Sequence, residues 1–393
     1  MKSMPYWKRN IEFYINRTFV ESENADIESI EGSIVEHFRN KYITESDKKL
    51  LNLFFKKDVL QEELDKFLEE WDIEREGGHK ALMLSYFMKN HPELSYSPYI
   101  KPRLDGILKY YKFKNLNILS HYKKICTALI SSNINFLIMK GGALRHYNPD
   151  FPRIMADVDI LIKDKKYEKA KNIAIKMGYK YTEYWHSIDL YETVSNNTVL
   201  DIHHKIDLQA KNEVSLNRDL FNRANREKVF GIEGVYVPCP EDMMFLLLSN
   251  LNKNLMRNTS YHSILYSIID SMYLFNLKSD FDWNIVRENA IKTKTESQVA
   301  VAIKFLNEYV PIKLPEMFSD EFYDKSILSV YDGVFVDKLR EESRSLKFNN
   351  IKSLSDLVYY VSFRLKYILY RRKFISKNVK FAKKILEKQG IIK

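Results

Sequence analysis

The sequence contains little cysteine, glycine and proline, and none of its hydrophobic runs is long. Among 393 residues there are 2 cysteines, Cys126 and Cys239, which excludes a disulfide scaffold and a zinc site with four cysteine ligands. The 11 glycines and 10 prolines are each about half the usual share, so few tight turns and many helices are expected. No apolar stretch approaches the ~18 residues that cross a bilayer. We therefore expect a helix-rich cytoplasmic protein without a transmembrane segment.

The charge of the chain is moderately positive. Lys and Arg number 62 and Asp and Glu 52, for a formal net charge of +10, and 45% of the residues are hydrophobic. This balance is ordinary for a folded protein and excludes a disordered chain. Because most lysines are mixed with acidic residues, we expect a solvated surface rather than a nucleic-acid groove.

The two ends of the sequence carry separate expectations. Charged residues interrupt the apolar residues near the start, so we do not expect a signal peptide there. Residues 364–393 are rich in Lys and Arg, with Glu387 as the single acid. We expect a solvated amphipathic helix in this basic tail, and contact with an anionic membrane surface or with RNA phosphates is the alternative.

Hydrophobic spacing divides the chain into three parts. Apolar residues recur at steps of three and four over residues 26–70, which predicts amphipathic helices. Three prolines within 92–102 then mark a boundary. We predict an N-terminal helical region over 1–103, an α/β core over 104–240, and a helical domain with the basic tail over 241–393.

Within the core, short apolar runs alternate with turn signals. We predict a helix over 104–131, strands over 135–139 and 158–162, a helix over 167–177, strands over 179–185, 187–194 and 198–206, a hairpin at Gly231 and Gly234, and a helix that begins at Pro240. The fold class is therefore α+β, a small mixed sheet flanked by helices.

Three aspartates on two of these strands point to a cation site. Alternate residues of a strand share a face, so Asp157 and Asp159 point the same way and repel each other unless a cation neutralises them. Mg²⁺ prefers such oxygen ligands. Asp201 adds a third carboxylate, and His203 shares its face. His203 is either a metal or phosphate neighbour or a histidine hydrogen-bonded within the sheet.

A glycine pair follows the first core strand. At Gly141 and Gly142 the backbone N–H groups can approach a phosphate, and the following helix start adds partial positive charge. Lys140, Arg145 and Arg153 lie near this turn and can neutralise phosphate oxygens, although Arg145 can equally be a solvated helix residue. A glycine turn followed by three carboxylates predicts a two-metal phosphoryl-transfer site.

This arrangement resembles the nucleotidyltransferase superfamily of DNA polymerase β, and more narrowly the bacterial family of uncharacterised nucleotidyltransferases. The motifs that carry the resemblance are Lys140-Gly141, Leu144, Tyr147, Arg153, Asp157-Val158-Asp159 and Asp201-Ile202-His203, with further similarity at His186, Pro240-Glu241-Asp242, Asp270 and Asp282-Trp283. It covers Leu104 to Glu308 and implies a polymerase β-like core.

The resemblance implies roles for these residues. Asp157 and Asp159 would hold two Mg²⁺ ions, or Mn²⁺, on the triphosphate of an NTP, and Asp201 would share one ion and help to activate an acceptor hydroxyl. The nucleotide-binding set would be Lys140, Gly141, Gly142, Arg145, Arg153 and His203. In-line attack on the α-phosphorus would release pyrophosphate.

The acceptor and the oligomeric state are not indicated by the sequence. The resemblance implies transfer of a nucleoside monophosphate to a hydroxyl of a small molecule, sugar, peptide or protein. An RNA or tRNA nucleotidyltransferase is an alternative, supported by the net charge and the basic tail. A non-catalytic nucleotide-binding scaffold is another, and the complete set of three carboxylates argues against it.

Overall fold

The computed structural model describes residues 43–318 except for 74–77, 152, 164–165, 185, 194–196, 207–212, 258–260 and 316. The chain divides into two compact units, one formed by residues 38–254 and 260–323 and the other by 1–37, 255–259 and 324–393. Apart from the end of one helix, the described residues belong to the first of these units. The basic tail and the start of the predicted N-terminal helices lie outside the described residues, and the three-part division of the chain stays a prediction.

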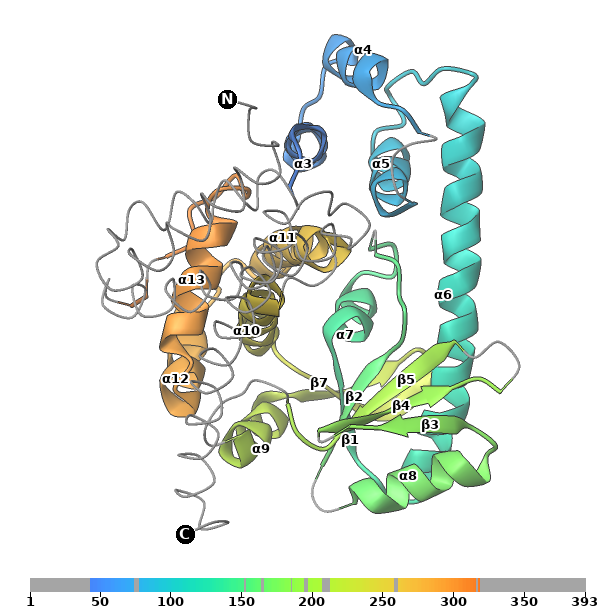
Figure 1. Ribbon diagram of the computed structural model, residues 1–393, viewed down its shortest axis with the longest axis vertical. Helices are drawn as coiled ribbons and strands as arrows, with labels where there is room; N and C mark the ends of the chain where they lie inside the picture. The colour runs from blue at the N-terminus through green and yellow to red at the C-terminus, as the bar shows by residue number, and fades with distance from the viewer. Residues whose placement is uncertain are drawn as a thin grey trace, which may run out of the picture. The chain divides into compact units, whose positions relative to one another are not determined.

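Helices precede and follow a single sheet in the described part of the chain (Figure 1). The helices are α3 (Glu45–Phe55), α4 (Gln61–Glu70), α5 (Gly78–Asn90), α6 (Ile100–Ser131), α7 (Lys140–Tyr147), α8 (Tyr167–Lys176), α9 (Glu213–Arg223), α10 (Pro240–Arg257), α11 (Tyr261–Asn276), α12 (Trp283–Thr293) and α13 (Glu296–Leu306). The strands are β1 (Phe136–Met139), β2 (Asp159–Ile162), β3 (Lys180–Glu183), β4 (Ser187–Tyr191), β5 (Thr198–His203), β6 (Asn225–Val229) and β7 (Ile232–Val237). The predicted α+β class is confirmed.

The sheet is mixed, with the strand order β3-β4-β5-β2-β1-β7-β6. Strands β2 and β5 pair in parallel, as do β1 and β7, whereas the remaining neighbours are antiparallel. Every residue of β1 and β2 is buried, because continuous apolar runs form strands covered on both faces. The β2–β5 register places Asp159 beside Asp201, so residues that are far apart in sequence meet at the centre of the sheet.

The long helix α6 contacts β5, β7 and α8 (Figure 1). Its inner face carries Tyr122, Ile125 and Leu129, whose side chains are fully buried and recur at helical spacing. The helix begins earlier than the predicted start at residue 104. Pro102 is accommodated in the first turn, where the N–H that proline lacks has no partner within the helix.

The predicted hairpin lies between β6 and β7. Phe230 and Gly231 have φ of 48° and 84°, the left-handed pair that a tight two-residue hairpin turn requires. The strands predicted over 179–185, 187–194 and 198–206 are present but shorter. They form an antiparallel meander whose last strand, β5, carries Asp201.

The helix predicted at Pro240 is present, and its first turn anchors the helices that follow. Asp242 is fully buried and accepts hydrogen bonds from Arg223 Nη2 at 2.6 Å and Asn289 Nδ2 at 2.8 Å. Glu241 accepts a hydrogen bond from Lys278 at 3.0 Å. These contacts tie α9 and α12 to α10 and hold α10 beside the sheet.

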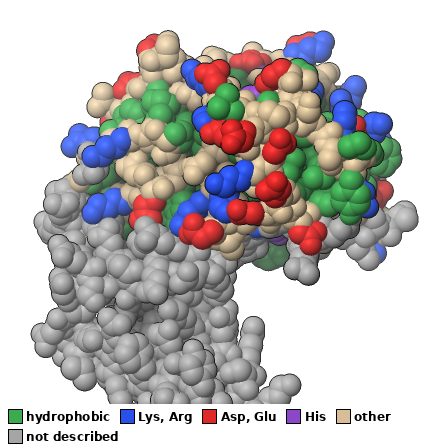
Figure 2. Space-filling view, turned by 90° about the horizontal axis from the view of Figure 1, so that it is seen from above, with side chains coloured by type: hydrophobic (Ala, Val, Ile, Leu, Met, Phe, Trp, Pro, Cys, Tyr) green, Lys and Arg blue, Asp and Glu red, His purple; other side chains and the backbone are tan. Residues whose placement is uncertain are grey.

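Charges of both signs are interspersed on the face formed by the first described helices (Figure 2). Surface ion pairs there join Lys48 to Glu45 at 2.5 Å and Lys101 to Asp105 at 3.1 Å. This face agrees with the dispersed charge predicted from the sequence. Within the described residues, no helix combines the length and the hydrophobicity that a membrane crossing needs.

Candidate functional site

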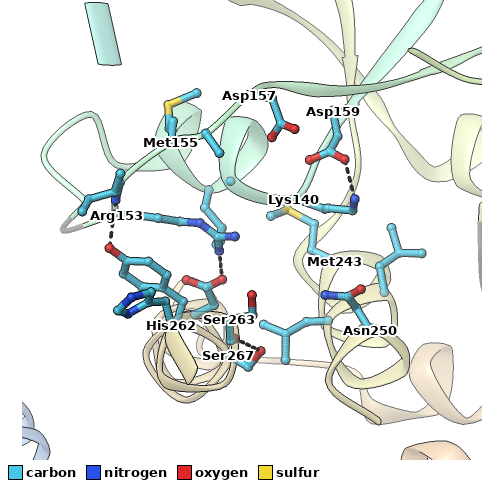
Figure 3. A pocket seen from close by; sticks show the side chains of 18 of the residues that line it. Lys140, Arg153, Met155, Asp157, Asp159, Met243, Asn250, His262, Ser263 and Ser267 are labelled. Atoms are coloured by element: carbon cyan, nitrogen blue, oxygen red, sulfur yellow. Dashed lines mark hydrogen bonds and ion pairs between the residues drawn. The ribbon is translucent and has the colours of Figure 1, made fainter. Parts of the chain in front are cut away.

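A cavity of about 370 Å³ lies where α7, the loop before β2, α10 and α11 converge. Figure 3 shows Asp157 and Asp159 side by side on the strand side of this cavity. The helical side includes Asn250 of α10 and Ser263 and Ser267 of α11. The structure thus gathers five predicted site residues around one cavity, namely Lys140, Gly141, Arg153, Asp157 and Asp159.

The turn between β1 and α7 is shaped by close packing. A Cβ on Gly142 would lie 2.9 Å from Ile138 Cδ1 and 3.0 Å from Val158 Cγ1, so only glycine lets α7 start this close to the sheet. Lys140 adopts φ of 47°, a conformation that costs a non-glycine residue about 1–3 kcal/mol. In this conformation its Nζ forms an ion pair with Asp159.

The loop that carries Asp157 is fixed from two sides. The buried side chain of Asn115, on α6, donates to the carbonyl of Arg153 at 3.1 Å and accepts from the N–H of Met155 at 3.0 Å. The hydroxyl of Tyr266, on α11, accepts from the N–H of Ile154 at 3.1 Å. These contacts position the loop at the entrance to β2, and no sequence motif points to Asn115 or Tyr266.

Asp159, Asp201 and His203 form one compact group. One ligand atom from each lies within 4.8 Å of the others. His203 Nε2 donates to Asp159 Oδ1 at 3.1 Å and contacts Asp201 Oδ2 at 2.8 Å. The Oδ1 atom of Asp201 is buried and has no hydrogen-bond partner. Two carboxylates, an imidazole and an unsatisfied buried oxygen fit a divalent cation.

The pKa values of these residues reflect how each charge is compensated. Burial, and then repulsion by Asp159, raise the pKa of Asp157 to about 7. Burial alone would raise the pKa of Asp159 too, but attraction by Lys140 and the hydrogen bond from His203 hold it well below its usual range. Burial would lower the pKa of His203, and its bonds to the two carboxylates outweigh this and raise it. Asp157 is thus the carboxylate whose charge the protein leaves least compensated.

Other residues near the sequence motifs lie outside this group. Arg145 is buried, donates to the Phe151 carbonyl at 3.3 Å and does not line the cavity, so the structure gives it a packing contact. His204 packs against the Tyr167 ring, with centroids 4.4 Å apart. The His186 ring lies 5.5 Å from that of His203.

Sequence reasoning missed one further carboxylate at the sheet. Asp189 of β4 is paired in register with Asp201 of β5. Burial, followed by repulsion from Asp201, raises the pKa of Asp189. The alternation of residues in the predicted β4–β5 hairpin could have placed Asp189 beside Asp201, because residues paired across antiparallel strands share a face.

Two solved structures are similar to the chain. The antibiotic-resistance factor ANT(2'')-Ia is 12% identical, with coverage of 46% of this chain and 91% of that chain and a TM-score of 0.33. An antigenic nucleotidyltransferase-like protein from Paracoccidioides brasiliensis is 16% identical, with coverage of 51% and 96% and a TM-score of 0.31. Similarity at this level carries no information about substrate.

No curated protein matches the sequence. The family model for uncharacterised nucleotidyltransferases matches residues 81–311, which is more than half of the 393 residues. This match confirms the resemblance seen in the motifs, and the chain therefore belongs to the family of uncharacterised nucleotidyltransferases.

Proposed function

We propose that the protein transfers a nucleoside monophosphate from an NTP to a hydroxyl of an acceptor, with release of pyrophosphate and with dependence on a divalent cation. The observation that carries the proposal is the position of Asp159 beside Asp201, with His203 in contact with both, next to a cavity that Asp159 lines together with Asp157, Lys140 and Gly141.

The donor set fits Mg²⁺ or Mn²⁺. Asp159 and Asp201 would hold the cation together with Asp157, and the buried Oδ1 of Asp201 is an unsatisfied acceptor ready for it. When bound, such an ion places positive charge on the phosphoryl oxygens. We assign two ions to the site because Asp157, Asp159 and Asp201 offer three carboxylates, of which Asp159 and Asp201 lie in one compact group with His203.

The remaining residues provide charge balance and orientation. Lys140 pairs with Asp159 beside the glycine turn at which we place the triphosphate. Its positive charge offsets the charge that develops as pyrophosphate leaves. Asp201 would share the cation and help to activate the acceptor hydroxyl, which loses its proton as its oxygen attacks. Positioning and charge neutralisation are the main demands of this chemistry.

The acceptor class is tested by following a labelled nucleotide. Purified protein is incubated with Mg²⁺, NTPs labelled at the α-phosphate, and either a small-molecule extract, a protein fraction or RNA. We expect label in a small-molecule, sugar, peptide or protein fraction and none in RNA. Label in RNA alone would replace this proposal with an RNA nucleotidyltransferase, and no NTP binding at all would leave a scaffold protein.

The metal assignment is tested with isosteric variants. Asp159→Asn and Asp201→Asn should each lower the Mn²⁺ affinity and the rate of transfer by about a hundredfold or more. Loss of a residue that only supports a metal ligand costs about 10–100-fold, and loss of a ligand should cost no less. Asp105→Asn, an exposed carboxylate that pairs with Lys101, is the matched control. Transfer and Mn²⁺ binding that persist in Asp201→Asn would refute the assignment.

A further inference from the structure

Asp270 places an unsatisfied acceptor in the cavity, at the end away from the metal group. Its side chain lies on α11, lines the cavity and is only 5% exposed. Its Oδ2 pairs with Arg153, whereas its Oδ1 is buried without a hydrogen-bond partner. A buried acceptor without a donor is destabilising. The Oδ1 atom is therefore suited to receive a hydrogen bond from a ligand.

Arg153 presents hydrogen-bond donors beside that oxygen. Its Nη1 is engaged with Asp270, and a Cβ on Gly141 would lie 3.0 Å from its Nε, so the guanidinium lies between the glycine turn and α11 (Figure 3). Among the described residues, Asp270 is the side chain with which it forms an ion pair. The pair has no net charge and offers N–H groups next to a carboxylate oxygen.

The side chains that surround this pair on the helical side of the cavity are neutral. Asn250, Ser263 and Ser267 contribute neutral polar groups. His79 and His262 stack with ring centroids 3.7 Å apart. Burial lowers the pKa of His79 to about 4 and also lowers that of His262, so both rings are neutral near pH 7. Such surroundings suit a neutral polar group better than a phosphate.

The position of the cavity identifies which substrate enters it. The cavity is lined by Lys140, Gly141 and Asp157, whereas Asp201 and His203 are not among its lining residues. Under the proposed function, the triphosphate lies at the former residues and the acceptor hydroxyl at Asp201. The part of the cavity that continues toward α11 then receives the nucleoside to which the triphosphate is attached.

We infer that the Arg153–Asp270 pair binds the nucleoside half of the NTP, through its base edge or its ribose hydroxyls, and not the phosphates. This inference rests on the proposed function. The ligand group is an uncharged one with a hydrogen-bond donor next to an acceptor, which both the base edges and the ribose diol provide. The donor binds Asp270 Oδ1 and the acceptor binds the guanidinium of Arg153.

The test separates the nucleoside from the phosphates by comparing NTPs with inorganic tripolyphosphate. Titration calorimetry with Mg²⁺ is carried out on the wild type and on Asp270→Asn, which keeps the shape of the side chain and removes its charge. We expect the variant to bind NTPs about tenfold or more weakly, the effect of losing a hydrogen bond to a charged group. Its affinity for tripolyphosphate should stay within about twofold of the wild type.

The four NTPs and their 2′-deoxy and 3′-deoxy forms distinguish the base from the ribose. A loss confined to one base assigns the pair to the base edge. An equal loss of affinity for all four NTPs points to the ribose. In that case the wild type should bind one deoxy form weakly, and Asp270→Asn should bind that form no more weakly than the wild type does. Asp150→Asn is the matched control, since Asp150 is 59% exposed and pairs with Lys89 at 2.6 Å outside the cavity.

Two results would overturn the inference alone. One is equal binding of NTP by the folded variant and the wild type; the other is a parallel loss of tripolyphosphate binding, which would make Asp270 a residue that positions Arg153 for phosphate. If the variant does not fold, the wild type alone still tests the inference. Equal affinities of the wild type for NTP and for tripolyphosphate would contradict a nucleoside site. A wild type that binds no NTP overturns the proposed function as well.

Discussion

Asp157 lies in a loop held by Asn115 and Tyr266, beside a carboxylate that Lys140 and His203 already neutralise. The protein therefore compensates the charge of Asp159 more fully than that of Asp157. In the metal-free protein the ionised form of Asp157 destabilises the fold, since burial and repulsion both disfavour it.

The pH dependence of stability tests this difference. A native pKa of about 7, against 3.8 in the unfolded chain, means that the stabilising contribution of Asp157 is complete below pH 3.8 and is lost as the pH rises through about 7. With a chelator present, Asp157→Asn should melt above the wild type, and the difference in Tm should grow from pH 5 to pH 8. A variant that melts below the wild type throughout this range would show that the protein itself neutralises the carboxylate.

The glycine turn gives a prediction about packing. Gly142→Ala places a Cβ against Ile138 and Val158 and should lower the free energy of unfolding by about 1–3 kcal/mol. Gly106→Ala is the control, since a Cβ there meets no atom within 4 Å and the residue lies inside α6. Denaturant unfolding should show Gly106→Ala to be more stable than the wild type by about 0.5–1 kcal/mol. Equal stability of the two variants would contradict the packing role.

At the scale of elements, local patterns predicted most of the core and its order. Strands β1 and β2, helix α8 and the β6–β7 hairpin occur where apolar runs and glycines indicated them. The predicted start of α6 is four residues too late, because the first turn of a helix tolerates a proline such as Pro102. The strand order and the β2–β5 register depend on contacts between distant segments, which periodicity does not encode.

The contacts of α10 also have a test at this scale. Asp242 is fully buried between Arg223 and Asn289, and removal of one member of a buried ion pair destabilises by about 3–5 kcal/mol. Asp242→Ala should therefore lower the Tm strongly, and addition of Arg223→Gln should cost less than the sum of the two single changes. Asp280→Asn, 79% exposed, is the control. Additive effects would show that the two side chains are not coupled.

At the scale of the whole molecule, the motifs predicted the family, and the β2–β5 pairing brings Asp159 and Asp201 together, while Asp157 lies in the loop before β2. Asp157, Asp159 and Asp201 were found from strand alternation and spacing. The contribution of Asn115 was not predictable, because it depends on how α6 crosses the sheet. The role proposed for Asp270 was not predictable either, since it follows from the packing of α11 against the loop that carries Arg153.

The central claim is that Asp159 and Asp201 hold a divalent cation together, next to the cavity that takes the nucleotide. Anomalous diffraction from crystals grown with Mn²⁺ and a non-hydrolysable NTP tests it most directly. We expect an Mn²⁺ peak in contact with carboxylate oxygens of both residues and with the triphosphate. An Mn²⁺ peak elsewhere, or one that contacts Asp159 while Asp201 remains bonded only to His203, would contradict the claim.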